Sequence, residues 1–168
     1  TNTMRMERFL AALMAIGTLM VVSCNTEVTV EEQTLKTMPV TSESIDGCWE
    51  LKSGLEDKFD NGSFLYIYFY QEGQRYELWT NIKVEENESA GGIVDPTSPL
   101  CTKGNYTIKD GDRDEYIMQG TYDHNDGGWG EGFIVKLFKP GNTMQWTSIA
   151  TGRTLIFART KELPEYFE

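Results

Sequence analysis

The feature of this sequence that most constrains its fold is a two-residue alternation of apolar and polar side chains between Cys48 and Thr160. Such alternation is typical of β-strands that bury one face. Short polar segments rich in Gly, Asn and Asp interrupt the pattern at regular intervals. No segment after residue 23 carries an apolar stripe of helical period over more than two turns. The sequence therefore predicts an all-β domain.

Turn residues divide this stretch into eight predicted strands. Pairs such as Asn61-Gly62 and Pro140-Gly141 are typical of hairpin connections. Every connection except residues 84–104 is short enough for an antiparallel hairpin, and closing such a meander removes its open edges. We therefore expect a single antiparallel eight-stranded up-and-down barrel. Its strands are predicted at Cys48–Leu55, Ser63–Gln71, Arg75–Lys83, Asn105–Lys109, Glu115–Tyr122, Gly132–Phe138, Thr143–Ile149 and Thr154–Thr160.

The N-terminal segment reads as a secretory signal. Two arginines, Arg5 and Arg8, precede the apolar run Phe9–Val22. As a helix this run would span only about 21 Å, short of the roughly 30 Å hydrocarbon core, so a membrane-spanning helix is disfavoured. The run ends in Val21-Val22-Ser23-Cys24, which resembles a bacterial lipobox. It predicts cleavage before Cys24 and acylation of that cysteine, for example with palmitate; the alternative is an ordinary signal with an incidental cysteine.

These signals divide the chain into three parts. We expect a lipoprotein signal peptide over residues 1–23 and a flexible tether over residues 24–44, which are rich in Thr, Glu and Ser. The barrel domain is expected over residues 45–168. The predicted location is the outer membrane, on either of its faces.

The charge of the chain limits its partners. The formal net charge is −11, and removing residues 1–23 takes away two positive charges and one negative, leaving −12. Nucleic acid and anionic lipid surfaces repel such an acidic domain, so we expect no nucleic-acid partner. Solubility is a sufficient explanation of the charge by itself.

After Cys24, two cysteines remain, Cys48 and Cys101. In a compartment that permits oxidation they predict a possible disulfide. Two buried free thiols are the alternative, because small apolar environments tolerate them.

Catalytic and metal-binding motifs are absent from the sequence. The only histidine, His124, lies in a predicted turn, and none of the common nucleophile, zinc-protease or phosphate-loop motifs occurs. A zinc site from Cys48, Cys101 and His124 would need three distant segments to converge. The acidic run Asp110–Glu115 lacks the glycine and the final carboxylate of a calcium loop. We expect a non-enzymatic protein without cofactor or metal.

The start and end of the predicted barrel carry a resemblance to a known family. Gly47-Cys48-Trp49 matches the Gly-x-Trp that opens lipocalin-like domains, and Arg159 stands where that superfamily places an arginine over the tryptophan. The chain resembles a distant lipocalin-like lipoprotein of Gram-negative bacteria over residues 45–160, although the family's Thr-Asp-Tyr-like motif is missing. The resemblance implies that Trp49 and Arg159 close one end by a cation–π contact, and that the barrel binds a small ligand. Alternatively, the two are a core aromatic and an exposed charge.

Twenty aromatic residues, fifteen of them in predicted strands, leave two interpretations of the interior: a filled core, or an apolar cup whose tyrosine hydroxyls contact a ligand. The alternation places Leu51, Leu137, Ser148 and Leu155 inside, and Lys136 and Gln145 outside. The candidate ligand-binding residues are Tyr66, Tyr68, Tyr116, Met118, Tyr122, Phe133, Val135, Met144, Trp146 and Phe157.

Two functions remain open at this point. The first is binding of a small apolar or amphipathic ligand inside the barrel. The second is a structural or protein-interaction module at the outer membrane that contacts an outer-membrane protein. An open internal pocket favours the first, whereas a packed interior with an apolar exterior patch favours the second.

Overall fold

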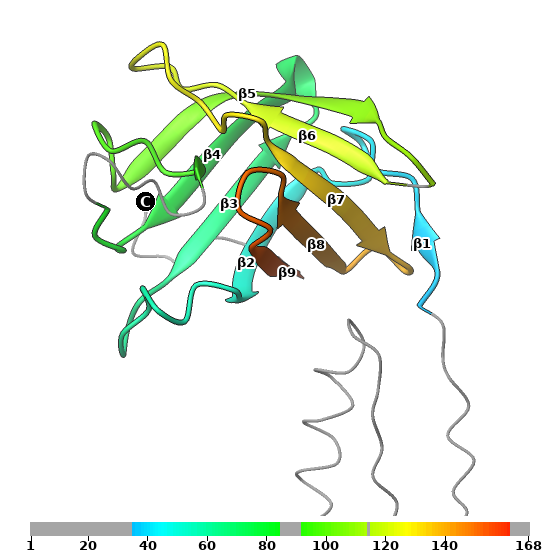
Figure 1. Ribbon diagram of the computed structural model, residues 1–168, viewed down its shortest axis with the longest axis horizontal. Helices are drawn as coiled ribbons and strands as arrows, with labels where there is room; N and C mark the ends of the chain where they lie inside the picture. Colours follow the sequence, from blue (N-terminus) through cyan, green and yellow to red (C-terminus); the bar gives the residue numbers. More distant parts are fainter. Residues whose placement is uncertain (1–34, 85–91, 114, 162–168) are drawn as a thin grey trace, which may run out of the picture. The chain divides into compact units, whose positions relative to one another are not determined.

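The computed structural model describes residues 35–84, 92–113 and 115–161, and these form a closed β-barrel (Figure 1). One 3₁₀ turn, Glu72–Gln74, labelled η2, lies wholly within these ranges, and no helix in them is long and apolar enough to cross a membrane. The described strands are β1 (Thr37–Met38), β2 (Gly47–Ser53), β3 (Leu65–Tyr70), β4 (Arg75–Thr80), β5 (Cys101–Asp110), β6 (Tyr116–Gly120), β7 (Phe133–Phe138), β8 (Thr143–Ser148) and β9 (Thr154–Thr160).

Strand pairing confirms the predicted fold class. Each strand from β2 to β9 pairs antiparallel with the next one along the chain, and β9 returns to pair with β2. The result is an eight-stranded up-and-down barrel, to which β1 is added. Because the ring of strands is closed, the barrel has no continuous edge that could pair with another chain.

Strand β1 pairs with the part of β7 that β6 is too short to reach. β6 pairs with the first half of β7, from Phe133 to Val135, whereas β1 pairs with Leu137 and Phe138 in the second half. The two-residue strand therefore lies beside β7 where β6 has already ended, as Figure 1 shows.

The barrel unit consequently begins earlier than expected. It starts at Thr37, and Val40 and Ile45 are buried in its core, at 2% and 0% exposure. The predicted tether over residues 24–44 is wrong for its last part. The polar composition of this stretch hid two apolar side chains that pack against the barrel, the buried Val40 and the partly buried Met38.

The expected start of the fourth predicted strand was also wrong. β5 begins at Cys101 rather than at Asn105, and its first half pairs with β4 from Arg75 to Trp79. Its buried positions there are Thr102 and Gly104. These small residues gave no apolar signal, so the sequence pattern assigned them to the preceding loop.

Aromatic rings from opposite walls meet inside the barrel. The Trp146 indole has its centroid 4.6 Å from Phe157, 5.3 Å from Phe133, 5.4 Å from Trp129 and 6.0 Å from Phe69. Each of these five side chains is at most 4% exposed. They join strands β3, β7, β8 and β9 and the β6–β7 loop in one packed core.

Side chains cover both ends of the barrel. At the end of the barrel where β2 begins, Arg159 lies over Trp49. The guanidinium carbon of Arg159 is 4.3 Å from the centroid of the Trp49 ring. At the opposite end, Ile93 and Val94 are fully buried, and the Tyr122 hydroxyl donates to the carbonyls of Gly92 and Val94 at 2.6 and 3.3 Å. The connection between β4 and β5 therefore contributes to the core, although its sequence is mostly polar.

Candidate functional site

Most of the predicted ligand-binding residues lie in the packed core of the barrel. Their side chains are at most 1% exposed, except that Tyr122 is 8% exposed and Tyr116 is only partly buried. The alternation predicted their direction correctly, because each faces the interior, although Tyr122 lies just after the end of β6. The inward-facing candidates are Tyr116, Met118, Tyr122, Phe133, Val135, Met144, Trp146 and Phe157.

The prediction was wrong for Tyr66 and Tyr68, which lie on the outside of the barrel. The residues that β3 buries are Leu65, Ile67 and Phe69, each at 0% exposure. Both faces of this strand are apolar, so the period alone could not choose between them. The hydroxyl group explains the direction. Tyr66 and Tyr68 keep their hydroxyl oxygens near water, whereas the buried side chains of this strand have no polar atom.

One group in the core is not hydrogen-bonded within the described residues. The indole Nε1 of Trp146 is buried and has no acceptor among them. The other interior polar groups near it have partners: Trp129 Nε1 donates to the Tyr76 hydroxyl at 3.1 Å, and that hydroxyl donates to the Thr121 carbonyl at 2.8 Å. Burying an unsatisfied donor is costly, which makes Trp146 the exception in this interior.

The second concentration of aromatic side chains is external. Tyr68 and Tyr70 have ring centroids 4.5 Å apart, and Phe64 and Tyr66 have centroids 6.0 Å apart. Trp79 of β4 is directly opposite Tyr66 in the register. These side chains are half-buried, and Tyr70 is 37% exposed. We call Phe64, Tyr66, Tyr68, Tyr70 and Trp79 the outer aromatic face.

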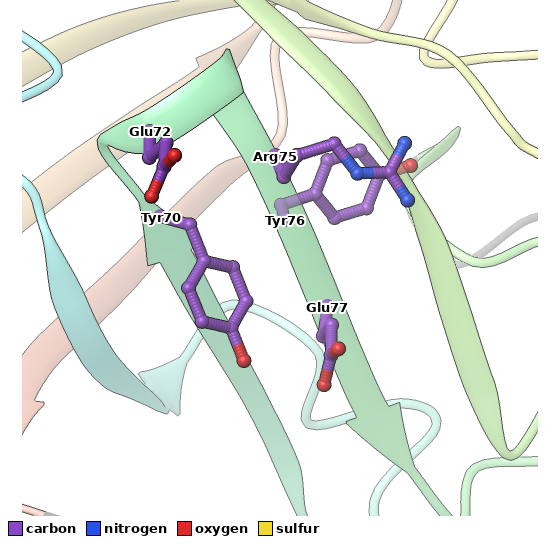
Figure 2. Close-up of a pocket in the computed structure, with 5 residues that line it drawn as sticks. All are labelled: Tyr70, Glu72, Arg75, Tyr76 and Glu77. Carbon is purple, nitrogen blue, oxygen red and sulfur yellow. The ribbon is translucent and has the colours of Figure 1, made fainter.

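A hollow of about 290 Å³ borders the outer aromatic face where β3 turns into β4. Figure 2 shows its lining residues, with the Tyr70 ring between the carboxylates of Glu72 and Glu77. The guanidinium of Arg75 extends away from these groups. It reaches Asp123, with Nη1 2.8 Å from Oδ1. The remaining lining residue is Tyr76, whose ring is buried inside the barrel.

The protonation states of the hollow follow from its surroundings. Burial, and next the negative charge of Glu77, raise the pKa of Tyr70, so its phenol is neutral at physiological pH. The hydrogen bond from Arg75 lowers the pKa of Asp123 and keeps that carboxyl ionised. The hollow is thus walled by a neutral aromatic ring and acidic side chains, while the charge of its arginine is neutralised outside it.

At the Trp49 end of the barrel, Arg159 of β9 links the turn between β7 and β8 to the segment that leads into β2. It donates from Nε to Gly141 at 3.0 Å, from Nη1 to Asp46 at 2.6 Å and from Nη2 to Ser44 at 2.7 Å, each time to a backbone carbonyl. Trp49 Nε1 donates to the Ile45 carbonyl at 2.8 Å. The structure therefore has the cation–π closure that the resemblance implies, and the alternative of an exposed, unpacked charge is wrong.

Cys48 and Cys101 are free thiols, so the predicted disulfide is wrong. Cys48 lies on β2 and Cys101 on β5, and β3 and β4 lie between them. Three strand spacings amount to about 14 Å, twice the Cα separation that a disulfide permits. Burial raises the pKa of each thiol to about 11, which keeps both protonated at neutral pH.

The other site predictions concern lipidation, metal and catalysis. Cys24 lies outside the described residues. Over residues 35–84, 92–113 and 115–161, no three His, Cys, Asp or Glu side chains gather closely enough to hold a metal ion. His124 is exposed in the loop between β6 and β7.

Comparisons with protein-family models, curated proteins and solved structures were made with the whole chain. None of them finds a match.

Sequence reasoning missed the outer aromatic face as a site. The signal was present, since four of the five aromatic residues between Phe64 and Tyr70 share one face of the predicted strand. The register that buries Leu65, Ile67 and Phe69 exposes all four. The residues of the hollow are close in sequence, between Tyr70 and Glu77, but the pattern there indicates only a hairpin turn and gives no sign of a hollow.

Proposed function

We propose that this chain is a non-enzymatic, lipid-anchored binding module of the outer membrane that contacts a partner protein through its outer aromatic face. The observation that carries the proposal is the presence of aromatic rings on the outside of β3 and β4 beside an open hollow. The lipocalin-like assignment is part of the proposal and concerns the barrel scaffold.

The chemistry of the outer aromatic face supports a protein partner. A tyrosine or tryptophan at a surface offers a large apolar area together with a polar tip, and these residue types dominate the energetics of protein interfaces. Tyr66 is paired with Trp79 on the adjacent strand and Tyr68 lies two residues further along β3, so the three side chains share one outer face. Contiguous apolar patches on a soluble surface mark interaction sites.

The packed interior supports the same choice. An eight-stranded barrel has room for its own side chains and at most one small ligand. Here the rings of Trp146, Phe133 and Phe157 meet across the centre. Binding energy is therefore more readily available on the outside of this barrel than within it.

Site-specific photo-crosslinking tests the proposal. A benzoylphenylalanine in place of Tyr68 is expected to give a discrete cross-linked protein adduct in envelopes of cells that make the chain. The matched control carries the same group at Gln145, a half-buried outward position on β8, and is expected to give none. Equal adducts at both positions, no adduct at position 68, or an adduct with a glycan instead of a protein would overturn the proposal.

The anchor is tested separately. Cys24→Ala is expected to leave the chain in the soluble extract, uncleaved and longer than the mature form, because stable anchoring needs more than one acyl chain. Immunoblots of soluble and membrane fractions make the measurement. Retention of the variant in the membrane fraction would contradict anchoring through Cys24.

One observation favours a second candidate, a small ligand inside the barrel. The buried Nε1 of Trp146 lies in the middle of the candidate ligand-binding residues and has no acceptor among the described residues. An acceptor atom on a ligand would satisfy it. In this case an apolar fluorescent probe quenches Trp146 emission, Met118→Trp blocks the quenching, and mass spectrometry of the purified chain finds a bound compound. Unchanged emission at saturating probe would reject this candidate.

A further inference from the structure

The hollow beside Tyr70 has a chemistry of its own within the outer aromatic face. Its two acidic side chains, Glu72 and Glu77, stand on either side of the tyrosine ring (Figure 2). Glu72 belongs to η2 and is exposed, and no ion pair to it is formed within the described residues. Glu77 has one loose partner, Lys103, whose Nζ is 3.6 Å from Oε1. The pocket therefore carries negative charge that its own side chains do not neutralise.

The one arginine that lines the hollow cannot serve as that counter-ion. Arg75 is held in a fork by Asp123 and also donates to Asn105 Oδ1 at 2.9 Å. Asn105 in turn donates to the Gly73 carbonyl at 3.1 Å, which fixes the turn above the hollow. These bonds hold the Arg75 charge on the side that faces β5, so the acidic side of the hollow stays open.

The aromatic wall of the hollow suits a cation. The Tyr70 ring is supported by Tyr68, whose ring centroid is 4.5 Å away, and it stays partly exposed. A cation placed over a tyrosine face and paired with a carboxylate gains both a cation–π contact and a charge-assisted hydrogen bond. A volume of about 290 Å³ accommodates one long side chain.

We propose that this hollow receives an arginine side chain of the partner protein, between the Tyr70 ring and the carboxylates of Glu72 and Glu77. The inference rests on the proposed function, since it names the chemistry of the partner segment that the outer aromatic face binds. A planar guanidinium stacks on the ring and forms bidentate bonds to a carboxylate, whereas a lysine ammonium would do only part of this. The acidic net charge of the chain attracts a basic partner over a longer range.

A peptide titration tests the inference without the partner. The probe is the blocked peptide acetyl-Gly-Arg-Gly-amide, added to ¹⁵N-labelled chain carrying Cys24→Ala and followed by NMR. We expect saturable shifts confined to Tyr70, Glu72, Glu77 and their strand neighbours. The same peptide with citrulline, which keeps the shape but loses the charge, is expected to produce none. Raising the salt concentration is expected to weaken binding.

Variants of the pocket complete the test. Glu72→Gln together with Glu77→Gln is expected to weaken the peptide about tenfold, which corresponds to about 1.4 kcal/mol. Tyr70→Leu is expected to weaken it about threefold while the carboxylates remain. The matched control is Glu131→Gln, an exposed carboxylate in the loop between β6 and β7, with no expected change. Unchanged spectra elsewhere in the barrel report that each variant is folded.

The outcomes separate this inference from the proposed function. Absent shifts, shifts spread over the acidic surface, equal effects of arginine and citrulline, or a double variant that binds as well as the parent would each overturn the arginine pocket. If the cross-link at position 68 forms in that case, the interaction module stands and only the pocket falls. If the peptide binds as expected but position 68 gives no adduct, the pocket stands and the proposed function falls.

Discussion

The inside of the barrel and its outer aromatic face use similar residues for different purposes. Inside, Trp146 and Phe157 are wholly buried, and the centroids of their rings are 4.6 Å apart. Outside, Tyr68 and Tyr70 form an equally close pair with their rings partly in water. The first pair gains the full free energy of apolar burial on folding. The Tyr68–Tyr70 pair keeps part of its apolar area exposed to water. Burying that area against a partner would provide free energy for binding.

The sharpest test of this comparison is a matched pair of truncations. Trp146→Ala removes the ring that four others contact and is expected to cost about 3–5 kcal/mol of unfolding free energy. Tyr68→Ala on the outer aromatic face is expected to cost about 1 kcal/mol or less. Urea unfolding followed by circular dichroism measures both. Similar costs for the two substitutions would show that the outer face also belongs to the structural core.

A glycine next to the core provides a second contrast. A Cβ added to Gly120 would lie 2.3 Å from the Trp129 ring, so Gly120→Ala must displace a buried side chain. We expect a loss of about 2–3 kcal/mol, as for other overpacked cores. Gly130→Ala meets no atom within 4 Å and is strained only by its φ of +62°. It is expected to cost about 1 kcal/mol. Equal Tm values for the two variants would contradict the tight packing of Trp129.

The closure of the barrel end should show an intermediate effect. Arg159→Met keeps the aliphatic stem but loses the cation–π contact and three hydrogen bonds to carbonyls. The expected cost is about 2 kcal/mol. Arg159→Lys is expected to recover less than half of it, because an ammonium cannot reach all three carbonyls. Full recovery by lysine in urea unfolding would mean that charge alone accounts for the closure.

The smallest effect is expected for the outer ion pair of Arg75 and Asp123. Its hydrogen bond lowers the pKa of Asp123 in the folded chain, so the stabilisation is present above the unfolded pKa, about 3.9, and is lost as the pH falls through the folded value. Because the pair is partly exposed, its contribution at pH 7 is about 0.2–1 kcal/mol. Asp123→Asn should therefore be less stable than the parent at pH 7 and equally stable near pH 2. A difference that persists in acid would point to a cause other than the charge.

The sequence was informative wherever one face of a strand differs in polarity from the other. On β7 and β8, Lys136 and Gln145 marked the outside, and the inward set followed correctly. On β3 both faces are apolar, so Tyr66 and Tyr68 were assigned to the wrong side. A two-residue period cannot indicate which face of a strand is buried when both faces are apolar.

The remaining errors have a common cause in non-local contacts. β1 forms because Met38 pairs with Leu137 beyond the end of β6. No local sequence pattern predicts this pairing. Ile93 and Val94 are buried where Tyr122, far along the chain, donates to the carbonyls of Gly92 and Val94. The distance between Cys48 and Cys101 depends on the order of strands around the ring rather than on their separation in sequence.

Strand β1 also gives the proposed anchor a mechanical property. A pull from the N-terminal side reaches the barrel first through the two residue pairs that β1 forms with β7. If these pairs peel and the chain straightens as far as Pro39, just before the buried Val40, about three residues are released, equal to roughly 10 Å of extra reach. The eight-stranded ring does not depend on β1 for its closure. If the chain is anchored through its N-terminal side as proposed, residues 37–39 would therefore yield under load before the barrel opens.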